Sequence, residues 1–103
     1  MAGRKKGFDM NKVRIIVDTL AKNPSGLWIR ELSRACGLPL STTSYYVNNV
    51  IFPLLDDARI GGEKSIIRVV RLKDSVLSRL RSGEDVSSIM KYVRVFKKIY
   101  SGG

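Results

Sequence analysis

The residues from Gly37 to Leu55 include no charged side chain, although the chain of 103 residues contains 19 lysines and arginines. When Thr43 is set at zero on a helical wheel of about 100° per residue, apolar side chains gather on one face of this stretch and polar ones on the other. The apolar face is predicted to pack in the hydrophobic core. The polar face offers hydroxyl, phenol and amide groups, and its members are Ser41, Thr42, Ser44, Tyr45, Asn48 and Asn49. The chemistry of such a face is hydrogen bonding, and its lack of charge is unusual for a solvated helix.

The sequence contains no comparable set of residues for acid–base catalysis, nucleophilic catalysis or metal binding. The chain has no histidine and one cysteine, Cys36, whose apolar neighbours favour a buried thiol over a reactive one. Asp56 and Asp57 are adjacent, so their side chains point in different directions, and we interpret them as a solvated helix end. The segment GGEKS lacks the spacing of a phosphate-binding loop. We therefore predict no catalytic residue, no metal site, no cofactor and no small-molecule ligand, and we do not expect an enzyme.

The charge balance indicates a polyanionic partner. Nineteen basic residues stand against 9 acidic ones, and the formal net charge is +10. Nucleic acid is favoured over a membrane surface, because no run of about 18 apolar residues and no strongly basic amphipathic helix is present. The start MAGRKKGF does not lead into an apolar segment, which predicts an intracellular protein. This length predicts one domain with one core.

Two short helices joined by a tight turn must position the polar face. The first ends at Gly37, whose backbone freedom suits a sharp turn, and Pro39 suits the first turn of a second helix that extends to Leu55. An earlier helix, capped by Asp9, is predicted to end before Pro24. A short strand is expected at residues 27–28.

Beyond residue 57 the pattern changes to β structure and then returns to helix. Gly61 and Gly62 separate a short segment, Ala58 to Ile60, from the β-branched run Ser65 to Leu72, which is typical of a hairpin. A helix over about residues 72–82 follows.

A last helix begins near Glu84 and carries a seam of apolar residues spaced three and four apart. Its members are Val86, Ile89, Val93, Phe96 and Tyr100. The seam either packs back on its own domain or joins two copies of the chain in a coiled-coil-like homodimer. We favour the dimer, because a core closed by three helices and a hairpin would leave the seam uncovered.

The order of these elements resembles the winged helix-turn-helix proteins, especially the small basic archaeal kind with a dimerising C-terminal helix. The resemblance covers about residues 10–80. It is carried by Arg30-Glu31-Leu32, by Gly37-Leu38 through Ser41-Thr42-Thr43-Ser44, and by Arg71-Leu72-Lys73-Asp74. The fold class it implies is mainly α with a small β-hairpin. Residues 1–8 are then a flexible basic arm, 9–82 the winged helix-turn-helix domain and 83–103 the dimerisation helix.

The resemblance implies that the helix over residues 39–55 is a recognition helix, with its N-terminal half in the major groove of double-stranded DNA. The residues that match the DNA-facing positions of the family are Ser41, Thr42, Ser44, Tyr45, Asn48 and Asn49. Contacts to phosphates from the wing, the preceding helix and the arm are expected from Arg59, Lys64, Arg68, Arg30, Arg34, Lys5 and Lys6. For Arg30 and Arg34 the alternative is a surface face paired with Glu31 or Asp18, and the arm is alternatively a solubilising tail.

The sequence departs from the family pattern at Pro39, which replaces the usual polar cap, at Thr43, where an aliphatic is usual, and at Pro53, which is able to shorten the helix. Three functions remain open. The favoured one is a dimeric, cytoplasmic and nucleoid-associated transcriptional regulator. The second is an architectural chromatin protein that binds DNA with little sequence preference. The third is a protein-interaction module within a larger assembly.

Overall fold

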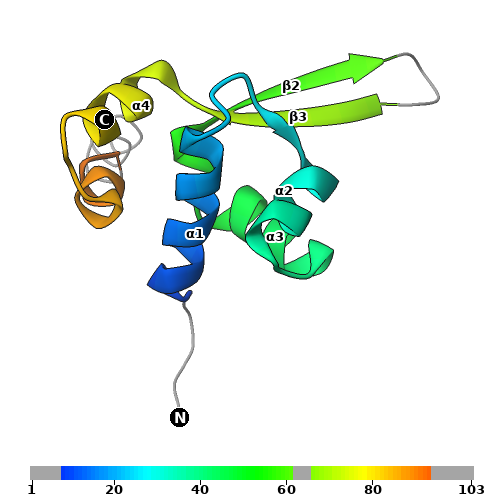
Figure 1. The fold of residues 1–103 in the computed structure, drawn as a ribbon, viewed down its shortest axis with the longest axis horizontal. Coiled ribbons are helices and arrows are strands. Elements are labelled where there is room, and N and C mark those ends of the chain that lie inside the picture. The colour runs from blue at the N-terminus through cyan, green and yellow to red at the C-terminus, as the bar shows by residue number, and fades with distance from the viewer. Residues whose placement is uncertain (1–7, 62–65, 94–103) are drawn as a thin grey trace, which may run out of the picture.

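The computed structural model describes residues 8–61 and 66–93, and over 57–61, 66 and 67 it describes the backbone alone. The elements occur in the order α1 (Met10–Ala21), β1 (Leu27–Trp28), α2 (Ile29–Cys36), α3 (Leu40–Asn49), the 3-10 helix η1 (Phe52–Leu54), β2 (Leu55–Gly61), β3 (Ile66–Leu72) and α4 (Asp74–Arg81). A further helical stretch covers residues 86–93. In Figure 1, α2 and α3 lie on one side of α1 and α4 on the other, and the β2–β3 hairpin projects on the α2 and α3 side.

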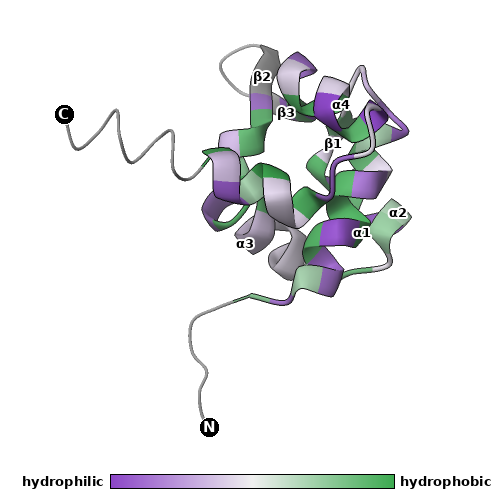
Figure 2. Ribbon diagram, turned by 90° about the vertical axis from the view of Figure 1, so that its left-hand side faces the viewer, coloured by the Kyte–Doolittle hydropathy of each residue, from purple (hydrophilic) through white to green (hydrophobic). Residues whose placement is uncertain are grey.

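Helix α1 begins where the sequence predicts, at the cap residue Asp9. The Asp9 carboxylate accepts a hydrogen bond of 2.9 Å from the backbone N–H of Asn11. The backbone N–H of Asp9 donates to the hydroxyl of Tyr46 at 2.8 Å, which connects the start of α1 to α3. The buried face of α1 consists of Val13, Ile16, Val17 and Leu20. Figure 2 shows the resulting alternation of hydrophobic and hydrophilic bands along this helix.

A small antiparallel sheet with the strand order β1-β3-β2 closes one side of the core. Leu27 pairs with Val70, and β2 pairs with β3 from Leu55 opposite Leu72 to Gly61 opposite Ile66. The chain enters β1 through Gly26, which has a φ of +105°. A Cβ at this position would lie 2.6 Å from the Cγ1 of Val69, so the close approach to β3 requires glycine.

The hairpin corrects one sequence interpretation. Asp56 and Asp57 were expected at a solvated helix end, but both belong to β2. The helical stretch ends earlier than expected because residues 50 and 51 leave the helix and Pro53 occupies the first turn of η1. The strand places Asp56 opposite Arg71, and an Arg71 guanidinium nitrogen lies 3.4 Å from the Asp56 carboxylate.

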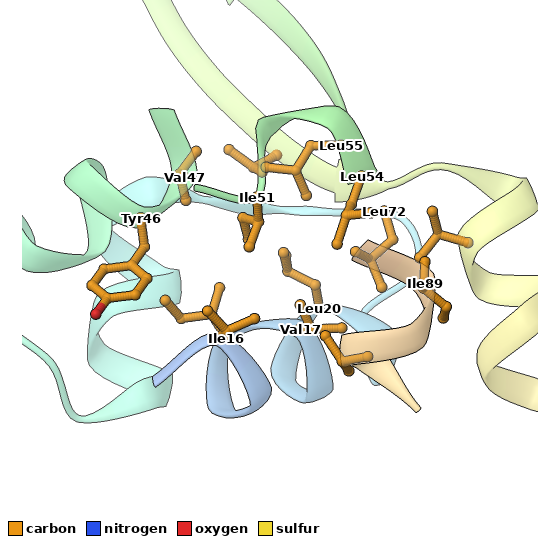
Figure 3. Packing of buried hydrophobic residues seen from close by; sticks show 14 of the residues in the cluster. Ile16, Val17, Leu20, Tyr46, Val47, Ile51, Leu54, Leu55, Leu72 and Ile89 are labelled. Carbon is orange, nitrogen blue, oxygen red and sulfur yellow. The ribbon is translucent and has the colours of Figure 1, made fainter. Parts of the chain in front are cut away.

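The same break shortens the predicted recognition helix. The sequence suggested one helix over residues 39–55, whereas α3 ends at Asn49 and η1 is a separate turn. The predicted core face is nevertheless correct. Thr43, Val47 and Ile51 are fully buried, and Figure 3 shows Tyr46, Val47 and Ile51 directed into one cluster with residues of α1.

The helical stretch over residues 86–93 contributes to the same core. Val86, Ile89 and Met90 are buried, and Figure 3 shows Ile89 in the cluster that includes Leu54 and Leu72. The premise that the core closes without this helix is therefore wrong for the first part of the seam. Val93 is half-buried, while Phe96 and Tyr100 lie outside the described residues.

The described residues thus form a mainly helical fold with a three-stranded antiparallel sheet. Three helices followed by a hairpin that returns to pair with β1 constitute the winged helix-turn-helix arrangement that the sequence predicted.

Candidate nucleic-acid interface

The turn between α2 and α3 is built around Gly37, which adopts a left-handed conformation with a φ of +72°. The backbone N–H of Leu38 donates to the carbonyl of Ser33 at 3.0 Å, and the N–H of Gly37 donates to the carbonyl of Arg34 at 3.2 Å. This pair of bonds is the Schellman motif, which satisfies the last carbonyls of a helix. The half-buried Leu38 packs against the core. The turn therefore holds α3 at a fixed angle to α2.

The polar face of α3 is exposed, as the sequence predicts. Tyr45 is 50% exposed, and Thr43, Tyr46 and Val47 hold the opposite face in the core. Ser41, Asn48 and Asn49 are exposed, and Thr42 and Ser44 are half-buried. The structure therefore brings together all six residues predicted to face DNA on one helix.

These six side chains differ in how far the protein already uses their hydrogen-bonding groups. The amide nitrogen of Asn49 donates to the carbonyl of Tyr45 at 3.2 Å. The ring of Tyr45 makes an edge-on contact with Tyr46, with centroids 5.7 Å apart. The Asn48 side chain has no partner among the residues that the structure describes. Asn48 consequently offers a complete amide, with both donor and acceptor, to a ligand.

The beginning of α3 supplies a second kind of donor. Pro39 precedes the helix and provides no side-chain cap, so the N–H groups of the first turn have no side-chain acceptor. The buried hydroxyl of Thr43 donates to the Pro39 carbonyl at 3.1 Å, which satisfies the polar group that replaces the usual aliphatic. Leu40, at the first position of the helix, is 41% exposed. Neither the uncapped N–H groups nor Leu40 was singled out from the sequence, although Pro39 was a usable signal for the missing cap.

Two arginines lie on α2, the helix before this surface. Arg30 and Arg34 are four residues apart, on one face of the helix, and both are exposed. The pairing expected as their alternative role is not observed, because Asp18 pairs with Lys22 and the Glu31 carboxylate accepts from the N–H of Trp28. Neither arginine forms an ion pair within the described part of the chain. Other basic residues do: Lys12 with Asp9, Arg14 with Asp85, Arg71 with Asp56 and Asp74, and Arg79 with Glu84.

The remaining predicted phosphate contacts are only partly described. Arg68 is a half-buried residue of β3, and the backbone of Arg59 lies in β2, directly opposite Arg68. Lys5, Lys6 and Lys64 lie outside the described residues.

The titratable groups with shifted pKa values lie away from the polar face. Hydrogen bonds from Asn11 and Lys12 lower the pKa of Asp9. Bonds from the hydroxyl and N–H of Ser87, together with Arg14, lower the pKa of Asp85 to about 2. Burial raises the pKa of the Cys36 thiol, whose sulfur lies 3.6 Å from the hydroxyl of Thr19. These shifts follow from helix capping and packing.

Several grooves border the described helices. One, of about 580 Å³, lies between α1 and α4 and includes Ile15, Leu80 and Val86 in its lining. Another, of about 160 Å³, is lined by Asn49, Val50, Phe52, Pro53, Leu54, Met90 and Val93. Over the described ranges no group of three His, Cys, Asp or Glu residues is arranged to hold a metal ion, and no helix there has the length and apolar character needed to cross a membrane.

Comparison with known families identifies the same segment. Residues 15–49, which are 35 of the 103, match the family model described as the IclR helix-turn-helix domain. The match runs from within α1 to the last residue of α3. No curated protein and no solved structure matches the chain significantly. The segment from α1 to α3 is thus similar to a helix-turn-helix DNA-binding domain, and the polar face of α3 lies within the matched residues.

Proposed function

We propose that this protein is a non-enzymatic transcriptional regulator that inserts α3 into the major groove of double-stranded DNA. The observation that carries this proposal is the exposed polar face of α3, held by the Gly37 turn inside the helix-turn-helix segment. Hydroxyl and amide groups on such a helix are able to contact base edges and phosphates. A DNA-binding role also fits the net charge of +10.

In this proposal, most of the affinity for DNA comes from contacts to its phosphates. Arg30 and Arg34 are the described candidates without ion pairs, and they project from the helix that crosses the DNA backbone in helix-turn-helix proteins. Arg59, Lys64 and Arg68 of the hairpin, and Lys5 and Lys6 of the arm, complete the proposed set. Each neutralised phosphate contributes a slope of roughly −0.9 to the dependence of log affinity on log salt concentration.

The first test is a titration of random-sequence duplex DNA with the full chain over a series of salt concentrations. We expect salt-sensitive binding, and the double variant R30A/R34A should weaken it for all sequences and reduce the salt slope by roughly 2. The control is R81A, which removes an exposed arginine from α4, on the other side of α1. Equal effects of R81A and R30A/R34A, or no duplex binding, would contradict the proposal.

We also propose that the chain acts as a homodimer through its C-terminal helix. Because Val86 and Ile89 lie in the core, the proposed contact residues are Val93 and, beyond the described residues, Phe96 and Tyr100. Support comes from the apolar surface beside Val93, where Phe52 is 44% exposed on η1. Such a dimer would present two α3 helices about one helical turn of DNA apart.

Sedimentation of the wild-type chain tests the dimer. We expect twice the monomer mass, and we expect F96E to yield monomers because a carboxylate is costly to bury in an apolar interface. S101E adds the same charge near the end of the chain and serves as the control. A wild-type chain that is monomeric at micromolar concentration would refute the dimer.

An architectural role is the second candidate, and the absence of charged side chains on α3 favours it. Selection from a random duplex library separates the two. A convergent palindromic motif supports the regulator, whereas tight retention without a motif supports the architectural protein.

A further inference from the structure

The surface that would meet base edges contains none of the side chains that usually read a G·C pair. Arginine and lysine recognise guanine through O6 and N7, and Asp and Glu accept from the amino group of cytosine. From Gly37 to Leu55 neither kind is present. Because α3 lies entirely within that range, hydrogen-bond reading by this helix depends on hydroxyls, a phenol and two amides.

The two amides are adjacent in sequence but differ in their hydrogen bonding. Asn49 already donates to the carbonyl of Tyr45 at 3.2 Å, which holds its side chain along the helix. Asn48 is exposed and engages no described residue. An asparagine amide with both groups available can donate to adenine N7 and accept from adenine N6 at the same time.

Asn48 lies in the last turn of α3 but shares its exposed face with polar residues of the N-terminal half. On the helical wheel it lies about 140° from the buried Thr43, in line with Ser41 two turns earlier and beside Tyr45. The Tyr45 ring makes its edge-on contact with Tyr46, at an interplanar angle of 80°. At the start of the same helix the exposed Leu40 provides an apolar group of the kind that contacts the methyl group of thymine.

We propose that Asn48 is the principal specificity-determining residue of this protein and that it selects an A·T base pair by a bidentate contact to adenine. This inference rests on the proposed insertion of α3 into the major groove. It adds that the preferred DNA site contains an adenine selected by the Asn48 side chain alone. It also adds that Asn49 contributes little to the choice of base.

The test is selection from a random duplex library with the full wild-type chain, N48A and N49A, followed by competition with defined duplexes. We expect the wild-type motif to contain an A·T pair. The preference of the protein for this pair over G·C should fall about tenfold in N48A, because that is the discrimination typical of one bidentate contact. N49A should keep the preference. Replacement of the adenine by 7-deazaadenine, which lacks N7, should weaken binding of the wild type and leave that of N48A unchanged.

Two further measurements separate this reading from a general defect. The circular dichroism melt of N48A should match that of the wild type, because the side chain is exposed and without a described partner. Its salt slope should also be unchanged, in contrast to that of R30A/R34A.

A wild-type motif that N48A leaves intact, or one that N49A alters instead, would overturn the inference while duplex binding stands. Retention of DNA without any motif would overturn it as well and favour the architectural role. Failure to retain duplex DNA would overturn the proposed function itself.

Discussion

Single residues carry much of the geometry of the turns around the helix-turn-helix. Gly26 and Gly37 both have positive φ, but their surroundings differ. A side chain at Gly26 would meet the stiff Val69 at 2.6 Å and the carbonyl of Val70 at 3.1 Å, whereas nothing lies within 4 Å of a Cβ at Gly37. The first position combines backbone strain with a steric clash, and the second has backbone strain alone.

We therefore predict that G26A and G37A destabilise the fold to different extents. G37A should lower the free energy of unfolding by about 1 kcal/mol, the cost of a left-handed conformation for a residue with a Cβ. G26A should cost about 2 to 4 kcal/mol, because overpacking against β3 adds to the strain. Urea denaturation of the two variants measures both values. A G26A loss no larger than that of G37A would show that β3 moves aside easily.

Cys36 provides a chemical prediction at the same scale. Burial raises the pKa of its thiol, so less of the reactive thiolate is present at neutral pH than in an unfolded chain. We expect slow reaction with a disulfide reagent at neutral pH, and a rate that increases as the pH approaches the raised pKa. The same chain in denaturant is the control. Equal rates in the folded and denatured chains would contradict the packing of Cys36 beside Thr19.

At the scale of elements, the helical stretch over residues 86–93 is held at its start by Asp85. The carboxylate accepts hydrogen bonds from the N–H of Ser87, at 3.1 Å, and from the Ser87 hydroxyl, and it pairs with Arg14 of α1 at 3.3 Å. These contacts lower its pKa to about 2. Its stabilising contribution is therefore complete above the ordinary aspartate pKa near 4 and is lost as the pH falls through about 2.

This leads us to expect a pH-dependent effect of D85N, which removes the charge and keeps a capping oxygen. The melting temperature of D85N should lie below that of the wild type near neutral pH, and the difference should shrink as the pH falls towards 2. Thermal melts across this range provide the measurement. In S87A, which removes one donor to the carboxylate, the wild-type pH dependence should be partly retained. A constant D85N difference down to low pH would refute the role of the charge.

The helices also show which parts of the fold were predictable from the sequence. The apolar spacing in α1 and the Asp9 cap were sufficient to predict that helix, and the neutral stretch around Thr43 identified both faces of α3. The end of α3 was predicted too late, because Val50, Ile51 and Leu54 keep helical spacing although the chain leaves the helix before η1. Ile51 and Leu54 are buried although they lie outside α3, so apolar periodicity alone could not locate the end of this helix.

The strand assignment of Asp56 shows a related limit. Aspartate is uncommon in strands, and its place here depends on Arg71 across the sheet, a contact between residues far apart in the sequence. The hydrogen bond that distinguishes Asn49 from Asn48 was likewise not predictable, since both are exposed amides in the same helix.

For the whole molecule, the main difference between the sequence prediction and the structure concerns where the core ends. The predicted boundary at residue 82 separates the domain from its last helix, but Val86, Ile89 and Met90 belong to the same buried cluster as α1 and η1. The division into domains at residue 82 stays a prediction. We propose instead that the independently folding unit extends at least to Met90.

We predict that I89A lowers the free energy of unfolding by about 2 to 5 kcal/mol, the usual cost of truncating a fully buried isoleucine. S88A, at the exposed neighbouring position, should change it by about 0.5 kcal/mol or less. A chain truncated after Gly83 should be less stable than either variant, because it loses all three buried side chains. Denaturant titration tests the set, and a truncated chain as stable as the wild type would restore the boundary at residue 82.

The groove lined by Asn49, Val50, Phe52 and Val93 joins the end of α3 to the last helix. Two partners that bind to opposite walls of one groove are able to change each other's binding free energy. Suppose that DNA binds α3 and that a second copy of the chain binds the last helix. If DNA binding then changes the dimer association constant by some factor, thermodynamic linkage requires that dimerisation changes the affinity for DNA by the same factor. The distribution of monomers and dimers would then respond to DNA, and the concentration of the protein would itself set how tightly each copy binds.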